Sequence, residues 1–139
     1  MREAGVMLII KDGLMLSVSR KHDPSKYGLA GGKVEPNETP KQGAMREAFE
    51  ETGIIVNDCE LIYQRVEPAE LPDGLPFYTY CFFATDWFGD PKALEGGTIK
   101  WFTAKEITSE ECTGGFHKYI KDILDNLQTK FPNIYIQGE

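Results

Sequence analysis

The sequence has few of the residues that build disulfide frameworks or zinc centres. Its three cysteines, Cys59, Cys81 and Cys112, are odd in number, widely spaced and without a CxxC pair. This pattern predicts reduced thiols and a cytoplasmic setting. Long hydrophobic runs are also missing near the start, because the apolar stretch 4–10 stops at Lys11-Asp12-Gly13, too soon for a signal peptide or a membrane span. We therefore expect no export and no membrane partner.

Positive charge is scarce as well. The chain has 15 Lys and Arg against 22 Asp and Glu, a formal net charge of −7. Surfaces that bind nucleic acid need clustered Lys and Arg, so we expect no nucleic-acid partner, and a phosphate-bearing substrate would need metal ions. The 139 residues, 41% hydrophobic and 12% aromatic, fit one globular domain over 1–139, with no repeat, linker or low-complexity tract.

Hydrophobic periodicity predicts an α/β (α+β) fold. Two strands at 4–11 and 14–20 are joined by an Asp12-Gly13 hairpin turn. Polar or proline-rich loops are expected at 22–28 and 67–76. Further strands are predicted at 54–66, 77–87 and 99–103. An amphipathic helix over 116–127 can cover a sheet face, which gives a mixed sheet with helices on opposite sides.

Another helix has clear start and stop signals. Thr39 is a good N-cap, Pro40 suits the first helical position, Gln42 completes a capping box, and Gly53 suits the C-terminal end. At about 100° per residue, one side of this helix is expected to pack and the other to face outward. The packing side carries Ala44, Met45, Ala48, Phe49 and Thr52, and the outward side carries Glu47, Glu50 and Glu51.

The acidic face is unfavourable for helix stability. Each like-charge pair three or four residues apart costs about 0.2–0.5 kcal/mol, and carboxylates in the C-terminal half oppose the helix dipole. Gly43 on the same face weakens the helix by about 0.8–1.0 kcal/mol relative to Ala. Hard oxygen ligands beside a bare patch of helix do suit one or more Mg²⁺ ions, with Mn²⁺ as the alternative, and leave room for phosphate oxygens.

The spacing around this helix is specific. Gly32 is followed after five residues by Glu38 and after seven more by Arg46-Glu47, and the segment ends at Ile54. It resembles the signature G-x5-E-x7-R-E-U-x-E-E-x-G-U of the Nudix family, in its MutT-like form, at every fixed position. Ala48 stands at the bulky aliphatic position U, and Ala30 stands where a proline is usual. The resemblance implies a Nudix α/β/α sandwich.

The resemblance also implies residue roles. Glu47, Glu50 and Glu51 would hold the metal ions, beside Gly32, where the backbone can approach a ligand closely. Glu50 is the candidate for removing a proton from the attacking water, and Glu95, in the loop before 99–103, is the rival. Arg46 is expected to pair with Glu50 or Glu38 and so to orient a ligating carboxylate.

Substrate contacts are predicted from residue type and position. Lys33 and Arg20 are the cations best placed to meet phosphate oxygens. Among the aromatic residues, Tyr27 and Tyr80 are candidates to stack a base, with Tyr80 facing away from Cys81 on its strand. His22 and His117 are isolated, so neither is expected to be catalytic.

The leading functional hypothesis is a pyrophosphohydrolase that converts a nucleoside triphosphate, or an oxidised (d)NTP, to a monophosphate and pyrophosphate. The alternative is a hydrolase of ADP-ribose or a nucleotide sugar, whose relatives often carry a proline some fifteen residues past the motif; Pro68 lies fourteen past Ile54. A third hypothesis, a non-catalytic nucleotide sensor, is disfavoured because every motif glutamate is present. The expected partner is a small nucleotide, bound by a monomer or a homodimer.

Overall fold

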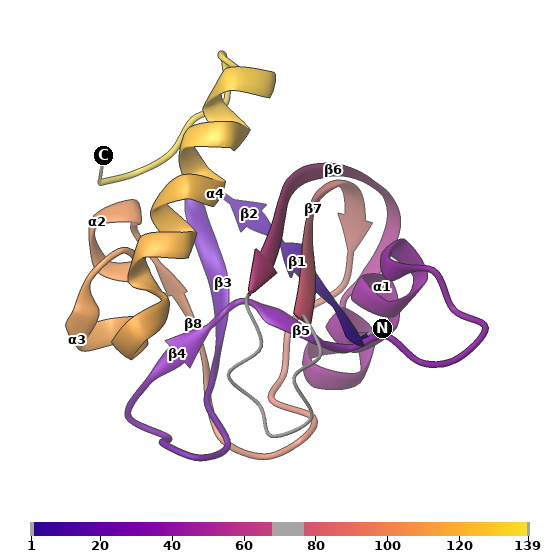
Figure 1. The fold of residues 1–139 in the computed structure, drawn as a ribbon. Coiled ribbons are helices and arrows are strands. Elements are labelled where there is room, and N and C mark those ends of the chain that lie inside the picture. The colour runs from indigo at the N-terminus through magenta and orange to yellow at the C-terminus, as the bar shows by residue number, and fades with distance from the viewer. Residues whose placement is uncertain (1, 68–76, 139) are drawn as a thin grey trace.

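The computed structural model describes residues 2–67 and 77–138 and confirms a mixed α+β fold (Figure 1). The strands are β1 (Arg2–Leu8), β2 (Ile10–Lys11), β3 (Leu14–Ser19), β4 (Tyr27–Gly28), β5 (Ala30–Lys33), β6 (Ile55–Glu67), β7 (Phe77–Phe88) and β8 (Ile99–Phe102). The helices are α1 (Pro40–Thr52), α2 (Ala104–Ile107), α3 (Glu110–Thr113), the 3₁₀ helix η1 (Gly114–Phe116) and α4 (His117–Lys130). No helix in these described ranges is long and apolar enough to cross a membrane.

The described strands form two four-stranded sheets where the sequence predicted one. The first has the order β5-β1-β7-β6, with β1 and β7 parallel and the other pairs antiparallel. The second has the order β2-β3-β4, with β8 also paired to β3. The single strand predicted over 4–11 is therefore wrong, because the chain passes from one sheet to the other at Ile9. Both sides of this stretch are largely buried, so hydrophobic alternation gives no sign of the break.

The turn predicted from local sequence is confirmed, whereas two short strands were not predicted. The Asp12-Gly13 turn between β2 and β3 is confirmed, with φ of 52° and 78° at its two residues, the positive values that a two-residue hairpin requires. The segment 22–28, predicted as a loop, includes β4, and the Gly31-Gly32 pair lies within β5. These strands were missed because they are short and rich in glycine. The predicted loop at 67–76 and Pro68 lie outside the described residues, apart from the last residue of β6.

Both predicted ends of α1 are confirmed. The Thr39 hydroxyl accepts from the Gln42 backbone N–H at 3.1 Å, and the Gln42 side chain accepts from the Thr39 N–H at 2.9 Å. Gly53 adopts a left-handed φ of 77°, and its N–H donates to the Phe49 carbonyl. The helix predicted over 116–127 is also found, as α4.

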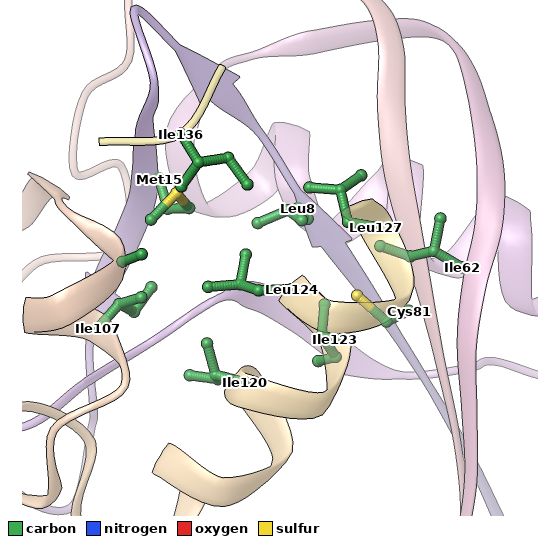
Figure 2. Close-up of a cluster of buried hydrophobic side chains, with 11 residues drawn as sticks. Leu8, Met15, Ile62, Cys81, Ile107, Ile120, Ile123, Leu124, Leu127 and Ile136 are labelled. Carbon is green, nitrogen blue, oxygen red and sulfur yellow. The ribbon is translucent and has the colours of Figure 1, made fainter. Parts of the chain in front are cut away.

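Two hydrophobic clusters lie on opposite faces of the first sheet, one towards α4 and one towards α1 (Figure 1). Leu8, Met15, Cys81 and Leu127 belong to the cluster beside α4 (Figure 2). Its counterpart beside α1 contains Met7, Ile9, Leu16, Ala44, Ala48 and Phe82. Neighbouring residues of β1, β3 and β7 thus enter different clusters, as the two-residue period of a strand requires.

The packing face of α1 is narrower than predicted. Ala44, Ala48 and Thr52 are fully buried, whereas Phe49 is 52% exposed, so the prediction that Phe49 packs is wrong. Phe49 lies about 100° around the helix from Ala48, at the margin of the buried stripe. The small side chain of Ala48, unusual for the motif, suits a helix that lies close to the sheet.

Gly5 of β1 allows this close approach of α1. A Cβ at Gly5 would lie 2.5 Å from the Pro40 carbonyl oxygen and 2.7 Å from the Ala44 nitrogen. Both are backbone atoms of α1, which cannot move without shifting the helix. We therefore expect Gly5→Ala to lower the free energy of unfolding by about 2 kcal/mol, measured by urea denaturation.

Gly115→Ala is the matched control, since a Cβ there meets nothing within 4 Å. It should leave the urea midpoint unchanged. Equal midpoints for Gly5→Ala and the unaltered protein would contradict this account of how α1 packs.

Candidate active site

Three carboxylates converge from two separate segments. Glu47 and Glu51 lie on one face of α1 because they are four residues apart, and Glu95 comes from the loop 89–98 between β7 and β8. Each offers an oxygen, and these three oxygens all lie within 4.8 Å of one another. The sequence predicted the first two as metal ligands together with Glu50, and named Glu95 only as a rival proton acceptor. Topology is what brings Glu95 to the helix.

Glu51 is partly buried and is hydrogen-bonded to the backbone of β5. Its Oε1 accepts a hydrogen bond from the Gly31 backbone N–H at 2.9 Å. The pKa of Glu51 is raised to about 7, mainly by burial and also by the charges of Glu47 and Glu95, while the Gly31 hydrogen bond acts in the opposite direction. The repulsion expected along the acidic face therefore extends across to the loop. A bound cation would relieve it.

Gly32 makes room for Glu47. A Cβ at Gly32 would lie 2.6 Å from the Glu47 carboxyl carbon and within 2.9 Å of both carboxylate oxygens. The absence of a side chain therefore lets the carboxylate sit against the backbone of β5. Gly31 and Gly32 both line the same cavity as Glu47, so this glycine pair forms one wall of the site.

Gly43 has a different role from the one predicted. A Cβ there would lie 2.9 Å from Glu38 Oε1, so the bare patch of α1 is filled by the Glu38 carboxylate. The expectation that this patch leaves room for phosphate oxygens is wrong. Phosphate would have to approach from the Gly32 side of Glu47.

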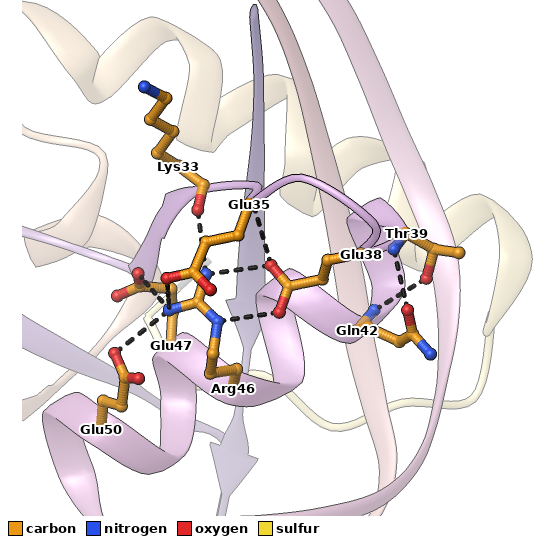
Figure 3. A network of polar contacts seen from close by, with 8 residues as sticks. All are labelled: Lys33, Glu35, Glu38, Thr39, Gln42, Arg46, Glu47 and Glu50. Atoms are coloured by element: carbon orange, nitrogen blue, oxygen red, sulfur yellow. Dashed lines mark hydrogen bonds and ion pairs between the residues drawn. The ribbon is translucent and has the colours of Figure 1, made fainter.

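Arg46 joins the helix to the segment before it (Figure 3). Its Nε and Nη2 donate to the two oxygens of Glu38 at 2.8 and 3.0 Å, and Nη2 also donates to the Lys33 carbonyl at 3.0 Å. Its Nη1 donates to Glu47 Oε1 at 2.9 Å and to Glu50 Oε2 at 3.1 Å. Arg46 thus makes both contacts considered from the sequence, and one to Glu47 in addition.

Arg46 and Glu38 stabilise each other's charged forms. Hydrogen bonding to Arg46 holds the pKa of Glu38 below its usual range, and Glu38 in turn raises the pKa of Arg46. The guanidinium therefore stays charged, with its planar fork fixed by Glu38. Arg46 therefore orients the Glu47 carboxylate through a hydrogen bond, and the missing side chain at Gly32 leaves room for it.

The carboxylates open onto a cavity of about 410 Å³. Its lining includes Gly32, Glu47, Glu51 and Glu95 together with two predicted cations, Arg20 and Lys33. Glu50 is not among the described lining residues, and its side chain is 44% exposed. The structure thus gathers most of the predicted site residues around one cavity, whereas Glu50 is outside the described lining and is hydrogen-bonded to Arg46.

The two tyrosines predicted to stack a base are not among the described lining residues either. Tyr27 is buried, with its ring edge-on to Phe102 at 5.1 Å and its hydroxyl 3.0 Å from Thr98 Oγ1. Tyr80 packs against the cluster beside α1, where burial and then Glu3 raise its pKa. Both rings are thus engaged within the protein.

Several lining residues were not singled out as site residues from the sequence. They include Ser19, Lys21, Ala93 and Thr98, and His22, which was considered and set aside, also lines the cavity. None belongs to a local motif, and they come from segments that meet only when β3 pairs with β8. The adjacent positive charges of Arg20 and Lys21 were the one signal in the sequence for this part of the cavity. They do not indicate which distant segment lies opposite them.

The donor set fits a hard divalent cation. Magnesium prefers carboxylate oxygens and keeps part of its water, and three carboxylates in the lining of one cavity provide that environment. Burial and the neighbouring charges of Glu47 and Glu95 disfavour the charged form of Glu51, and a bound cation would favour it. The fold and the site together define a class of α+β protein with an acidic helix, a glycine wall and a carboxylate loop around one cavity.

Comparison with known proteins identifies the family. The NUDIX domain model matches residues 1–122. The chain is 32% identical over 91 residues to the 8-oxo-dGTP diphosphatase of Escherichia coli K12, covering 65% of this chain and 67% of that protein. It is 29% identical over 109 residues to the CTP pyrophosphohydrolase of the same organism, covering 76% and 78%.

A solved structure agrees in fold. The MutT NUDIX hydrolase from Burkholderia pseudomallei superposes with a TM-score of 0.73 at 23% identity, covering 88% of this chain and 97% of that one. The chain therefore belongs to the Nudix family of hydrolases, in its MutT-like form, as the sequence motif predicted.

Proposed function

We propose that this protein is a Mg²⁺-dependent pyrophosphohydrolase of nucleoside triphosphates, including oxidised forms, which releases a nucleoside monophosphate and pyrophosphate. The observation that carries the proposal is the convergence of Glu47, Glu51 and Glu95 on a cavity that Arg20 and Lys33 also line. Opposite charges around one cavity suit a polyphosphate that is shared between a cation and basic side chains.

Glu47, Glu51 and Glu95 would hold the ion. Glu50, which matches a metal-binding position of the family motif, would join them from the Arg46 side. When bound, Mg²⁺ supplies Lewis-acid stabilisation of the diphosphate oxygens and of the charge that develops on them. Gly32 contributes by keeping the Glu47 carboxylate against the wall of the site, and Arg46 by holding its orientation.

Arg20 and Lys33 would bind the phosphate oxygens that the ion does not reach. Both residues are exposed and both line the cavity. The Arg20 guanidinium and the Lys33 ammonium group can therefore contact an entering substrate. Arg20 suits two-point binding of a phosphate, whereas Lys33 acts as a point charge.

Two carboxylates are candidates for removing the proton from the attacking water. Glu95 lines the cavity, whereas Glu50 is not among the described lining residues and is hydrogen-bonded to Arg46. Because a general base must reach the water it deprotonates, we place Glu95 ahead of Glu50 in this role.

A substrate screen with product identification tests the proposal. The protein is incubated with Mg²⁺ and unmodified or oxidised nucleoside triphosphates, nucleotide sugars including ADP-ribose, and dinucleoside polyphosphates. We expect a monophosphate and pyrophosphate from one or more triphosphates, no turnover after EDTA, and recovery when Mg²⁺ is added back. Turnover confined to ADP-ribose or nucleotide sugars would replace the substrate class. No turnover with any of them would favour a non-catalytic sensor.

A further inference from the structure

The loop 89–98 that carries Glu95 is bonded to α1 at its first half. The Lys92 N–H donates to the Thr52 carbonyl at 2.9 Å, and the Leu94 N–H donates to the Glu51 carbonyl at 3.2 Å. The residue before Glu95 is therefore joined through the backbone to Glu51, the carboxylate that Glu95 faces. These bonds fix one side of the loop.

The other side of the loop is held at Thr98, three residues beyond Glu95. The Thr98 carbonyl accepts from the Ser19 N–H at 2.9 Å, and the Thr98 N–H donates to Ser19 Oγ at 3.0 Å. Thr98 Oγ1 lies 3.0 Å from the Tyr27 hydroxyl, within hydrogen-bond distance. All three polar groups of Thr98 are thus engaged by residues of β3 and β4.

The backbone between Glu95 and Thr98 depends on these contacts. Gly96 and Gly97 have φ of 82° and 74°, left-handed values that favour glycine. A Cβ at Gly97 would collide with Ser19 Oγ. The chain therefore turns back sharply against the Ser19 side chain within the few residues that follow Glu95.

Tyr27, whose hydroxyl contacts Thr98, is itself held in place by its neighbours in the second sheet. Ser19 and Tyr27 are register partners of β3 and β4. The Tyr27 ring is buried against Phe102 of β8, and Lys100 Nζ lies 5.4 Å from its centroid. The Tyr27 hydroxyl is therefore fixed by three strands of the second sheet, whereas Glu95 lies on an exposed loop.

We propose that Ser19, Tyr27 and Thr98 form a clasp that positions Glu95 against the carboxylates of α1. The clasp makes Tyr27 a positioning residue, a role distinct from the base stacking expected from the sequence. This inference rests on the proposed function, because that function places Glu95 among the groups that hold the cation. Groups that orient a metal ligand without touching the metal have measurable effects on metal affinity.

The test measures Mn²⁺ affinity of the full chain by electron paramagnetic resonance, without substrate. The variants are Tyr27→Phe, Ser19→Ala and Thr98→Val, each made alone and each combined with Glu95→Gln. We expect each single clasp variant to bind Mn²⁺ about tenfold more weakly. Adding any of them to Glu95→Gln should cause no further loss, because the clasp acts only through Glu95.

Two further variants separate positioning from general damage. Thr98→Ser keeps the hydroxyl and should keep normal Mn²⁺ affinity, in contrast to Thr98→Val. Tyr135→Phe removes a hydroxyl from an exposed tyrosine outside the cavity lining and should also bind normally. Thermal melting of every metal-free variant identifies any that has lost the fold.

The outcomes distinguish the clasp from the proposed metal site. If Glu95→Gln weakens Mn²⁺ binding but the clasp variants do not, the clasp is wrong and the metal site stands. If the clasp variants weaken binding equally with and without Glu95, they act on the fold in general and the clasp is again wrong. If the unaltered protein does not bind Mn²⁺, the proposed function fails and takes the clasp with it.

Discussion

Glu51→Gln is expected to lower kcat by about 10³-fold or more while leaving the metal-free fold at least as stable. The loss of turnover follows from removing a charged group that would hold the cation at the reacting phosphate. The fold should persist because the glutamine oxygen can still accept the hydrogen bond from Gly31. Neutralising Glu51 also removes the cost of burying its charge and its repulsion with Glu47 and Glu95, all of which raise its pKa.

Three measurements check this prediction: steady-state kinetics with Mg²⁺, metal-free thermal melting, and melting with added Mg²⁺. The unaltered protein should melt higher when Mg²⁺ is added, and the variant should lose most of that increase. Glu60→Gln, at an exposed position of β6, is the matched charge control and should change none of them. Near-normal turnover by Glu51→Gln would remove Glu51 from the metal site.

Gly32→Ala is expected to reduce kcat/KM by about 10²-fold with little change in stability. The added Cβ would lie 2.6 Å from the Glu47 carboxyl carbon. The atoms in its way belong to the end of a flexible side chain, so Glu47 can turn aside while the backbone stays in place. A displacement of about 1 Å at a catalytic site has an effect on rate of this size.

The comparison with Gly5→Ala makes the result informative. Both substitutions place the new Cβ less than 3 Å from another atom. At Gly5 the nearest atoms belong to the backbone of α1, and at Gly32 they belong to the Glu47 carboxylate. Gly5→Ala should therefore lower the urea midpoint, and Gly32→Ala should lower activity. Gly115→Ala should do neither. If Gly32→Ala instead lowers the urea midpoint and leaves kcat/KM of the folded protein unchanged, Gly32 has a structural role only.

Short-range signals in the sequence were enough to predict α1 and the carboxylates that it carries. The capping residues Thr39 and Gln42 and the stop at Gly53 act within a few residues, so the helix ends could be predicted from neighbours alone. The four-residue spacing of Glu47 and Glu51 then placed two carboxylates together, and the wider motif identified the family. The Asp12-Gly13 turn was predictable for the same local reason.

The residues that face α1 across the site could not be predicted from local sequence. Whether Glu95 reaches Glu51, whether Gly43 receives Glu38, and whether Tyr27 is buried all depend on contacts between residues far apart in the chain. The break between β1 and β2 at Ile9 is of the same kind, because a strand buried on both faces shows the same composition whichever sheet it joins. Local patterns encode helix caps and faces, whereas the third carboxylate and its support are set by how two sheets pack.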